Sequence, residues 1–292
     1  MLERMRVDEF LSAVLSLAKP LEPLDLPLLD AHGATLASDV FAGDRLVLKA
    51  GTPIRSTQIG LAASIGLDHL PTRPLPRVVI LSAGPDLVEP GQPVSGQQEY
   101  ETNSWQLTTM VREIGGVGYR VHHIPDDEVE LKNVIEDQLV RADLLVLSGE
   151  RHDDSFDLIT RTLNQIGSVK MAELDIEGSG RHNFGTVGPD NTPVITLPGD
   201  PIAAYISMQL FVRPVIRTMF GAKEIHCPAV KARLEKSVND LSGKRNYLRA
   251  FISEDKNSVM ALSEQDEFLT LASADRKSTR LNSSHTDISR MP

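Results

Sequence analysis

The 292-residue sequence contains one cysteine, no excess of basic residues and no long apolar run, and each absence narrows its possible functions. Cys227 alone cannot form an internal disulfide or a multi-cysteine zinc site, which favours a reducing compartment. The 30 Lys and Arg residues are outnumbered by 40 Asp and Glu, for a net charge of -10 without a basic cluster. Binding to nucleic acid through its phosphates is therefore not expected. No window approaches the ~20 apolar residues that span a bilayer.

The first 20 residues are predicted to form an amphipathic helix rather than a signal peptide. Glu3, Asp8 and Glu9 interrupt any apolar core that a signal peptide would need. One face of the expected helix carries Val7, Leu11, Val14, Leu15 and Ala18. Without a signal peptide or a transmembrane segment, the chain is expected to be cytoplasmic.

Regular alternation of strand and helix patterns runs from residue 76 to residue 222. Strands are predicted at 77–84, 118–124, 143–149, 169–176 and 192–199, with helices at 102–116, 127–142 and 155–167 between them. A long helix over 200–221 should be interrupted at Pro214, because proline removes a helix hydrogen bond. This pattern predicts the α/β class, with a parallel sheet between two layers of helices.

The remaining segments are expected to flank this domain. Residues 1–75 are assigned to an elongated N-terminal lobe without an apolar run long enough for its own core, and the Pro-rich stretch 70–77 links it to the α/β domain. Residues 223–275 look like a truncated C-terminal β domain. The Ser-rich, basic tail 276–292 resembles a translated sequencing-library adapter more than native protein.

Five stretches of the sequence carry a family resemblance through their order and spacing. They read "ILSAGPDLVEPGQPV", "YETN", "IPDD", "VLSGERHDDSFD" and "LPGDPIAAYISMQLFVRP". The series resembles the molybdopterin molybdenumtransferase family, which includes MoeA and the E domain of gephyrin. The resemblance implies a homodimer that inserts molybdate into adenylylated molybdopterin, with Mg²⁺, molybdopterin and molybdate as ligands.

Matched position by position, the resemblance also implies site residues. Asp86 and Asp157 become the catalytic carboxylates, and Asp126 with Asp127 the metal pair. The implied cofactor-binding residues are Ser148, Gly149, Glu101, Asn103, Pro198, Gly199 and Asp200.

The chain departs from the family pattern where charge matters most. The family's "SGGVSVGxxD" loop reads "SGERHDDSFD" here, and "KPGKP" reads "EGSGR" at 177–181. Smaller changes give "SAGPDL" for "STGDEL", "YETN" for "YDTN" and "LPGDP" for "LPGNP". A phosphate loop needs glycine amides close to the anion and no carboxylates beside it, so the loop at 148–157 is not expected to hold phosphate. It could instead bind a divalent cation, although a solvated loop with an acidic first helix turn is favoured.

A whole β domain of the family is missing between Ala42 and Gly43. In the family that domain supplies acidic site residues and completes the site across the dimer, so one wall of the implied site is absent. Two functions stay open: a catalytically impaired protein of molybdenum cofactor biosynthesis, or a non-catalytic, gephyrin-like dimeric scaffold. The scaffold would bind a protein or peptide partner, such as a cell-division or membrane-receptor peptide. The degraded motifs favour the scaffold.

Overall fold

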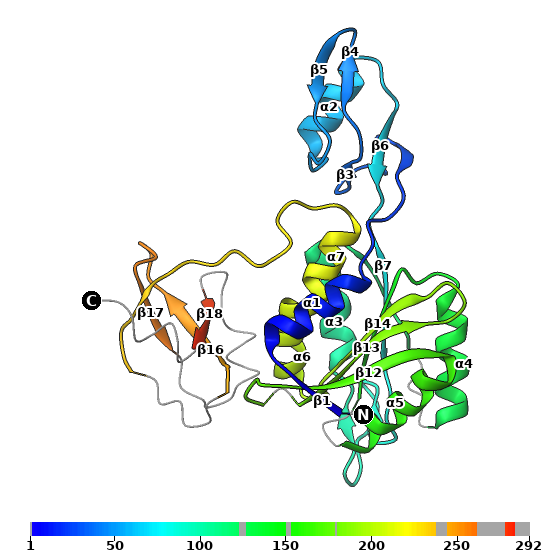
Figure 1. Cartoon of the computed structure of the whole chain (residues 1–292), viewed down its shortest axis with the longest axis vertical. Helices are drawn as coiled ribbons and strands as arrows, with labels where there is room; N and C mark the ends of the chain where they lie inside the picture. The colour runs from blue at the N-terminus through cyan, green and yellow to red at the C-terminus, as the bar shows by residue number, and fades with distance from the viewer. Residues whose placement is uncertain are drawn as a thin grey trace.

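A seven-stranded sheet lies at the centre of the molecule (Figure 1). The computed structural model describes residues 2–122, 127–149, 153–178, 180–237, 244–261 and 278–283. The strand order is β1-β12-β13-β14-β11-β7-β10. In chain order the strands are β1 (Leu2–Met5), β7 (Arg77–Ser82), β10 (Val117–Arg120), β11 (Leu144–Ser148), β12 (Gly167–Leu174), β13 (Arg181–Val187) and β14 (Thr192–Leu197).

Six of the seven strands pair in parallel with at least one neighbour, which confirms the predicted α/β class. Strands β10, β7, β11 and β14 form a continuous parallel set, and β1 is parallel to β12. Strand β13 runs antiparallel to both β12 and β14, so the sheet is mixed rather than purely parallel. No strand was predicted at the position of β13.

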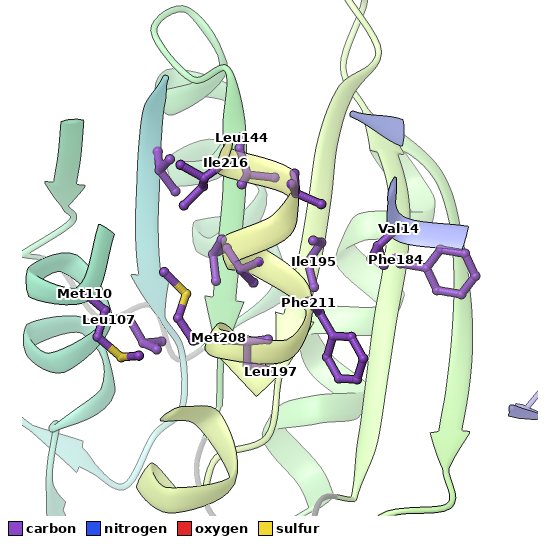
Figure 2. Packing of buried hydrophobic residues seen from close by; sticks show 14 of the residues in the cluster. Val14, Leu107, Met110, Leu144, Phe184, Ile195, Leu197, Met208, Phe211 and Ile216 are labelled. Atoms are coloured by element: carbon purple, nitrogen blue, oxygen red, sulfur yellow. The ribbon is translucent and has the colours of Figure 1, made fainter. Parts of the chain in front are cut away.

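Helices cover both faces of the sheet and make three layers. On one face lie α1 (Val7–Leu17), α3 (Asn103–Ile114), α6 (Pro201–Ser207), η1 (Met208–Val212) and α7 (Arg213–Met219); α4 (Glu128–Leu139) and α5 (Asp153–Ile166) lie on the other. Successive side chains of a strand point to opposite faces. Accordingly Val78 and Ile80 pack under the first layer and Val79 and Leu81 under the second. Figure 2 shows the first core, where α3, η1 and α7 meet the sheet.

The helix after β14 is divided as expected near Pro214, but the interruption is a π-helical turn. Helix α6 runs into η1, whose five residues end two positions before Pro214, and α7 continues from there. Proline has no N–H for the preceding turn and its ring crowds the carbonyl four residues back. A wider π turn accommodates that gap without ending the helix.

The first 17 residues belong to the α/β unit in the structure rather than to the lobe. Strand β1 pairs with β12, and α1 buries Val7, Phe10 and Val14 in the first core. Of the helix face predicted from the sequence, Val7 and Val14 are buried, whereas Leu11, Leu15 and Ala18 are only partly buried.

The N-terminal lobe projects from one end of the α/β unit (Figure 1). It contains β2 (Leu24–Pro27), β3 (Thr35–Leu36), β4 (Val40–Ala42), β5 (Arg45–Leu48), α2 (Ser56–Ser64) and β6 (His69–Arg73). The expectation that it lacks its own core is wrong. Single residues from many short segments, among them Leu36, Ile54 and Leu70, form a small separate cluster.

Short strands also occur in the described parts of the C-terminal region. They are β15 (Arg233–Leu234), β16 (Asn246–Ile252), β17 (Ser258–Ala261) and β18 (Ser278–Ser283), in the order β15-β17-β16-β18. Strand β18 falls within the stretch assigned to a non-native tail, and the rest of that tail lies outside the described residues. The boundaries at 75, 222 and 275 stay predictions. Within the described ranges, none of the helices combines the length and apolar character required to cross a membrane.

Candidate functional site

Three turns meet at the carboxyl edge of the sheet, as predicted. In the parallel register Ser148 of β11 is level with Ser82 of β7 and with Leu197 of β14. The turns at 83–84, 149 and 198–199 therefore leave the sheet side by side. Ligands of open α/β sheets bind outside this edge.

A cavity of about 220 Å³ opens at this edge. Most of its wall comes from the segment between β7 and α3, which includes the short parallel pair β8 (Leu87–Val88) and β9 (Glu99–Tyr100). The lining residues are Leu87, Glu99, Tyr100, Glu101, Thr102, Asn103, Gly149, Gly199 and Pro201. Four predicted cofactor-binding residues thus share one cavity: Glu101, Asn103, Gly149 and Gly199.

Glu101 is almost completely buried and its carboxylate is surrounded by donors. Oε1 accepts hydrogen bonds from Ser82 Oγ at 2.7 Å and from the Ser104 backbone N–H at 2.7 Å. Oε2 accepts from Ser104 Oγ and from Arg120 Nη2, the latter at 3.3 Å. Ser148 Oγ lies 3.2 Å from Ser82 Oγ and extends the network to the next strand. Such burial of a carboxylate is tolerated only when it is paired and hydrogen-bonded.

Asn103 connects two walls of the cavity. Its Nδ2 donates to the Gly199 carbonyl oxygen at 2.7 Å, which joins the first turn of α3 to the "LPGDP" turn. Its Oδ1 is buried and has no hydrogen-bond partner among the described residues. Because a buried acceptor without a partner is costly, this oxygen is a natural contact for a ligand donor.

Two predicted site carboxylates act as helix caps. Oδ1 of Asp200 accepts from Ile202 N at 3.0 Å and from Ala203 N at 2.9 Å, at the start of α6. Oδ1 of Asp127 accepts from Val129 N and Glu130 N, both at 2.8 Å, at the start of α4. Aspartate at this position satisfies backbone donors that the helix cannot. Neither residue lines the cavity.

The two predicted catalytic carboxylates also lie outside the cavity lining. Asp157 forms an ion pair with Arg181, whose Nη1 is 3.0 Å away, and the guanidinium lies over the ring of Phe156. The backbone carbonyl of Asp86 accepts from Glu99 N at 2.9 Å where β8 and β9 pair. Their catalytic roles stay predictions.

The described residues do not fit a Mg²⁺ site. Among them, no group of three or more His, Cys, Asp or Glu side chains is placed to hold a metal ion. Oxygen atoms of Glu101, Asp127 and Asp157 are already engaged by protein donors. Asp126 of the predicted metal pair lies outside the described residues, as do Glu150, Arg151 and His152.

The described cavity wall is acidic, so it favours ligands that donate hydrogen bonds over ligands that carry negative charge. Glu99 and Glu101 contribute two carboxylates, and no Lys or Arg is among the described lining residues. Ser148 and Pro198 are buried and are not among the lining residues, although each directly precedes one of them, Gly149 and Gly199. Leu87, Glu99, Tyr100, Thr102 and Pro201 are not predicted site residues. The sequence signal was available, because Tyr100 and Thr102 belong to "YETN", Pro201 to "LPGDP" and Leu87 to "SAGPDL", and Glu99 directly precedes "YETN".

A family model described as "Probable molybdopterin binding domain" matches residues 79–218, the stretch that contains the cavity. "Molybdopterin molybdenumtransferase 1" of Mycobacterium tuberculosis is 29% identical over 228 residues, 78% of this chain and 53% of the relative. "Gephyrin" of Dictyostelium discoideum is 26% identical over 252 residues, 75% of this chain and 35% of the relative. A crystal structure titled molybdopterin biosynthesis moea protein, from Pyrococcus horikosii, superposes with a TM-score of 0.77 at 17% identity. The superposition covers 96% of this chain and 97% of the other.

The chain spans about half the length of the first of these curated relatives. The structural likeness, at 17% identity, establishes the common fold. The sequence relatives and the matched domain connect the cavity region to proteins named for molybdopterin.

Proposed function

Because the chain belongs to the MoeA/gephyrin-like family, we propose that it acts in molybdenum cofactor biosynthesis as a molybdenumtransferase-like protein with impaired chemistry. The cavity at the carboxyl edge of the sheet supports this proposal most directly. It gathers residues from three stretches of the family pattern: Glu101 and Asn103 from "YETN", Gly149 from "VLSGERHDDSFD" and Gly199 from "LPGDP". The ligand proposed for it is adenylylated molybdopterin.

The impairment follows from charge. Molybdopterin ligands carry phosphates. The described lining residues include two carboxylates and no Lys or Arg, although Arg120 pairs with Glu101 from outside the lining. In the sequence, Glu150, Asp153 and Asp154 replace small loop residues, and Glu177 replaces a lysine. A unit charge ~4 Å from a phosphate is worth about 4 kcal/mol at an effective dielectric constant of 20. Several reversed charges would remove the affinity for a polyanion, so no molybdate insertion is expected.

Isothermal titration calorimetry of the unmodified protein with adenylylated molybdopterin and Mg²⁺ tests the proposal. We expect heats too small to define binding at micromolar ligand. A micromolar dissociation constant, about -8 kcal/mol, would overturn the impairment.

A reverted protein should bind more tightly. The reversion replaces 149–154 by a "GGVSVG"-like loop and Glu177 by lysine; a second lysine at Gly180 would occupy a left-handed backbone, φ 59°, at a cost of about 1–2 kcal/mol. Asp137→Lys, on the exposed surface of α4, makes the same charge change as Glu177→Lys and is the matched control. If Glu177→Lys and Asp137→Lys increased the affinity for the ligand equally, net charge rather than the site would govern binding.

A dimeric scaffold without catalysis is the second candidate, and the lobe favours it. Phe41 and Leu46 face each other across the β4–β5 hairpin and are 54% and 45% exposed. The hairpin closes through Gly43 and Asp44, at the place where the family pattern carries its additional β domain. Exposed large apolar side chains that lie together are typical of protein interfaces.

The homodimer can be tested by sedimentation equilibrium. We expect a dimer that Phe41→Asp weakens at least tenfold. Val140→Asp, at a residue that is also apolar and is 88% exposed at the C-cap of α4, should leave it intact. The scaffold would be excluded if the wild-type protein stayed monomeric when its concentration was raised 100-fold in the same experiment. It would also be excluded if Phe41→Asp and Val140→Asp weakened the dimer equally.

A further inference from the structure

Arg120 is the centre of a buried polar network beside the cavity. It is the last residue of the edge strand β10, and only 7% of its side chain is exposed. Nε donates to Ser104 Oγ at 2.6 Å and Nη1 to His122 Nδ1 at 2.9 Å. Nη2 donates to Glu89 and to Glu101, the latter at 3.3 Å. A planar guanidinium can serve four partners at once, which an ammonium group cannot.

The indole ring of Trp105 packs against the guanidinium of Arg120. The Arg120 Cζ atom lies 4.1 Å from the centre of the indole ring, and Trp105 is 49% exposed. This cation–π contact holds the plane of the guanidinium against α3. Trp105 is the single tryptophan of the chain, so all tryptophan emission of the protein comes from the residue in this contact.

Glu101 has little capacity left for a ligand, although it lines the cavity. A carboxylate offers about four acceptor sites. Donors from Ser82, Ser104 and Arg120 take up four contacts, two of them from Ser104. The carboxylate therefore acts on the cavity wall through its neighbours rather than by direct binding.

The neighbour that Glu101 controls is the beginning of α3. Thr102 occupies the N-cap position but makes no side-chain cap bond; the Ser104 N–H is bound by Glu101 instead. Asn103, between them, lines the cavity, and its buried Oδ1 has no hydrogen-bond partner among the described residues. Whatever holds Glu101 in place also sets the position of this oxygen.

We propose that Arg120 is a positioning residue of the cavity, which acts through Glu101 on the first turn of α3 and so on Asn103. Arg120 stands in none of the stretches that carry the family resemblance. The proposal rests on the proposed function only for the identity of the ligand. The geometry of the protein alone already requires the guanidinium fork, because Glu101 would otherwise be a buried carboxylate without a cation.

The experiment compares Arg120→Lys and Glu101→Gln with Arg112→Lys, a change at an exposed arginine of α3. Hydrogen exchange and side-chain amide signals are followed by NMR in the ligand-free protein. Arg120→Lys should lower protection of the Ser104 amide at least tenfold and shift the Asn103 side-chain amide. Glu101→Gln should do the same, and Arg112→Lys should change neither.

Two further measurements distinguish a positioning role of Arg120 from a general effect on protein stability. Protection of amides in the central strand β11 should stay within a factor of two in Arg120→Lys, and the Trp105 emission should shift. An unchanged Asn103 signal, or a uniform loss of protection that includes β11, would overturn the proposal. Neither reading uses a ligand, so a failure of ligand binding in calorimetry would not be mistaken for a failure here.

Discussion

Phe10 provides the sharpest test of how the N-terminal helix is attached to the α/β unit. Its side chain is completely buried, at the point where α1 crosses the sheet. The ring makes edge-on contacts with His182 at 5.3 Å, Phe184 at 5.1 Å and Phe211 at 4.7 Å between centroids. One side chain thus joins α1 to β13 and to η1.

Replacing Phe10 by alanine should cost about 4 kcal/mol of unfolding free energy. Buried Phe→Ala changes cost ~3–5 kcal/mol because burial is lost and a cavity is left. The three aromatic contacts, each worth about 0.5–1.5 kcal/mol, keep the change above the lower end of that range. This is a large share of the ~5–15 kcal/mol by which a domain is stable.

Urea unfolding followed by Trp105 fluorescence measures this cost in the right part of the molecule, because Trp105 lies on α3 of the α/β unit. Phe251→Ala, at an exposed phenylalanine of β16, is the control and should change stability by less than about 0.5 kcal/mol. A cost below about 1.5 kcal/mol for Phe10→Ala, or equal costs for the two variants, would refute the attachment through this aromatic cluster.

Two other predictions concern single side chains. Burial lowers the pKa of His182 from 6.5 to about 3, so the unfolded chain binds a proton between these values and the folded chain does not. Stability should therefore fall as pH drops below 6.5, by about 2 kcal/mol at pH 5, and His182→Gln should flatten this part of the curve in urea titrations at successive pH values. Asp200→Ala should cost about 1 kcal/mol by loss of the α6 cap while Asp200→Asn should not; equal melting temperatures for all three proteins would contradict the capping role.

The central strands could be predicted because they are buried on both faces. Residues 77–82 and 144–148 are nearly continuous apolar runs bounded by turn residues, which is typical of parallel strands between helix layers. The sequence also predicts helix α1, but the predicted buried face omits Phe10. Phe10 and Leu11 stand three and four residues after Val7, so both fit one helix face, and the packing of the first core buries Phe10 fully and Leu11 partly.

Strands β1 and β13 could not be predicted because pairing, rather than local preference, makes them strands. Strand β1 is short and half charged, and its ladder depends on β12. Strand β13 carries buried His182 and Asn183 and a glycine in its middle. A Cβ atom at Gly185 would lie 2.1 Å from the Ser168 carbonyl oxygen, so glycine there reflects a close approach to β12 and not a turn.

The cavity could be located from the sequence, but the partners of its charges could not. Loops that follow parallel strands meet at one edge, which brings Glu101, Asn103, Gly149 and Gly199 together. The partner of Asp157, Arg181, is 24 residues away, and Arg120 reaches Glu101 from a neighbouring strand. Such contacts depend on strand order and side-chain direction, which no local pattern contains.

The pairing of β1 with β12 has a consequence for synthesis. Leu2 aligns with Met171, roughly 170 residues later in the chain. At ~5–20 residues per second, a ribosome produces the partner strand about 10–30 seconds after the first strand. For that time the apolar face of α1, with Phe10 at its centre, has no sheet to cover it. The nascent chain therefore carries an uncovered amphipathic helix, a segment suited to chaperone binding, until most of the α/β unit has been translated.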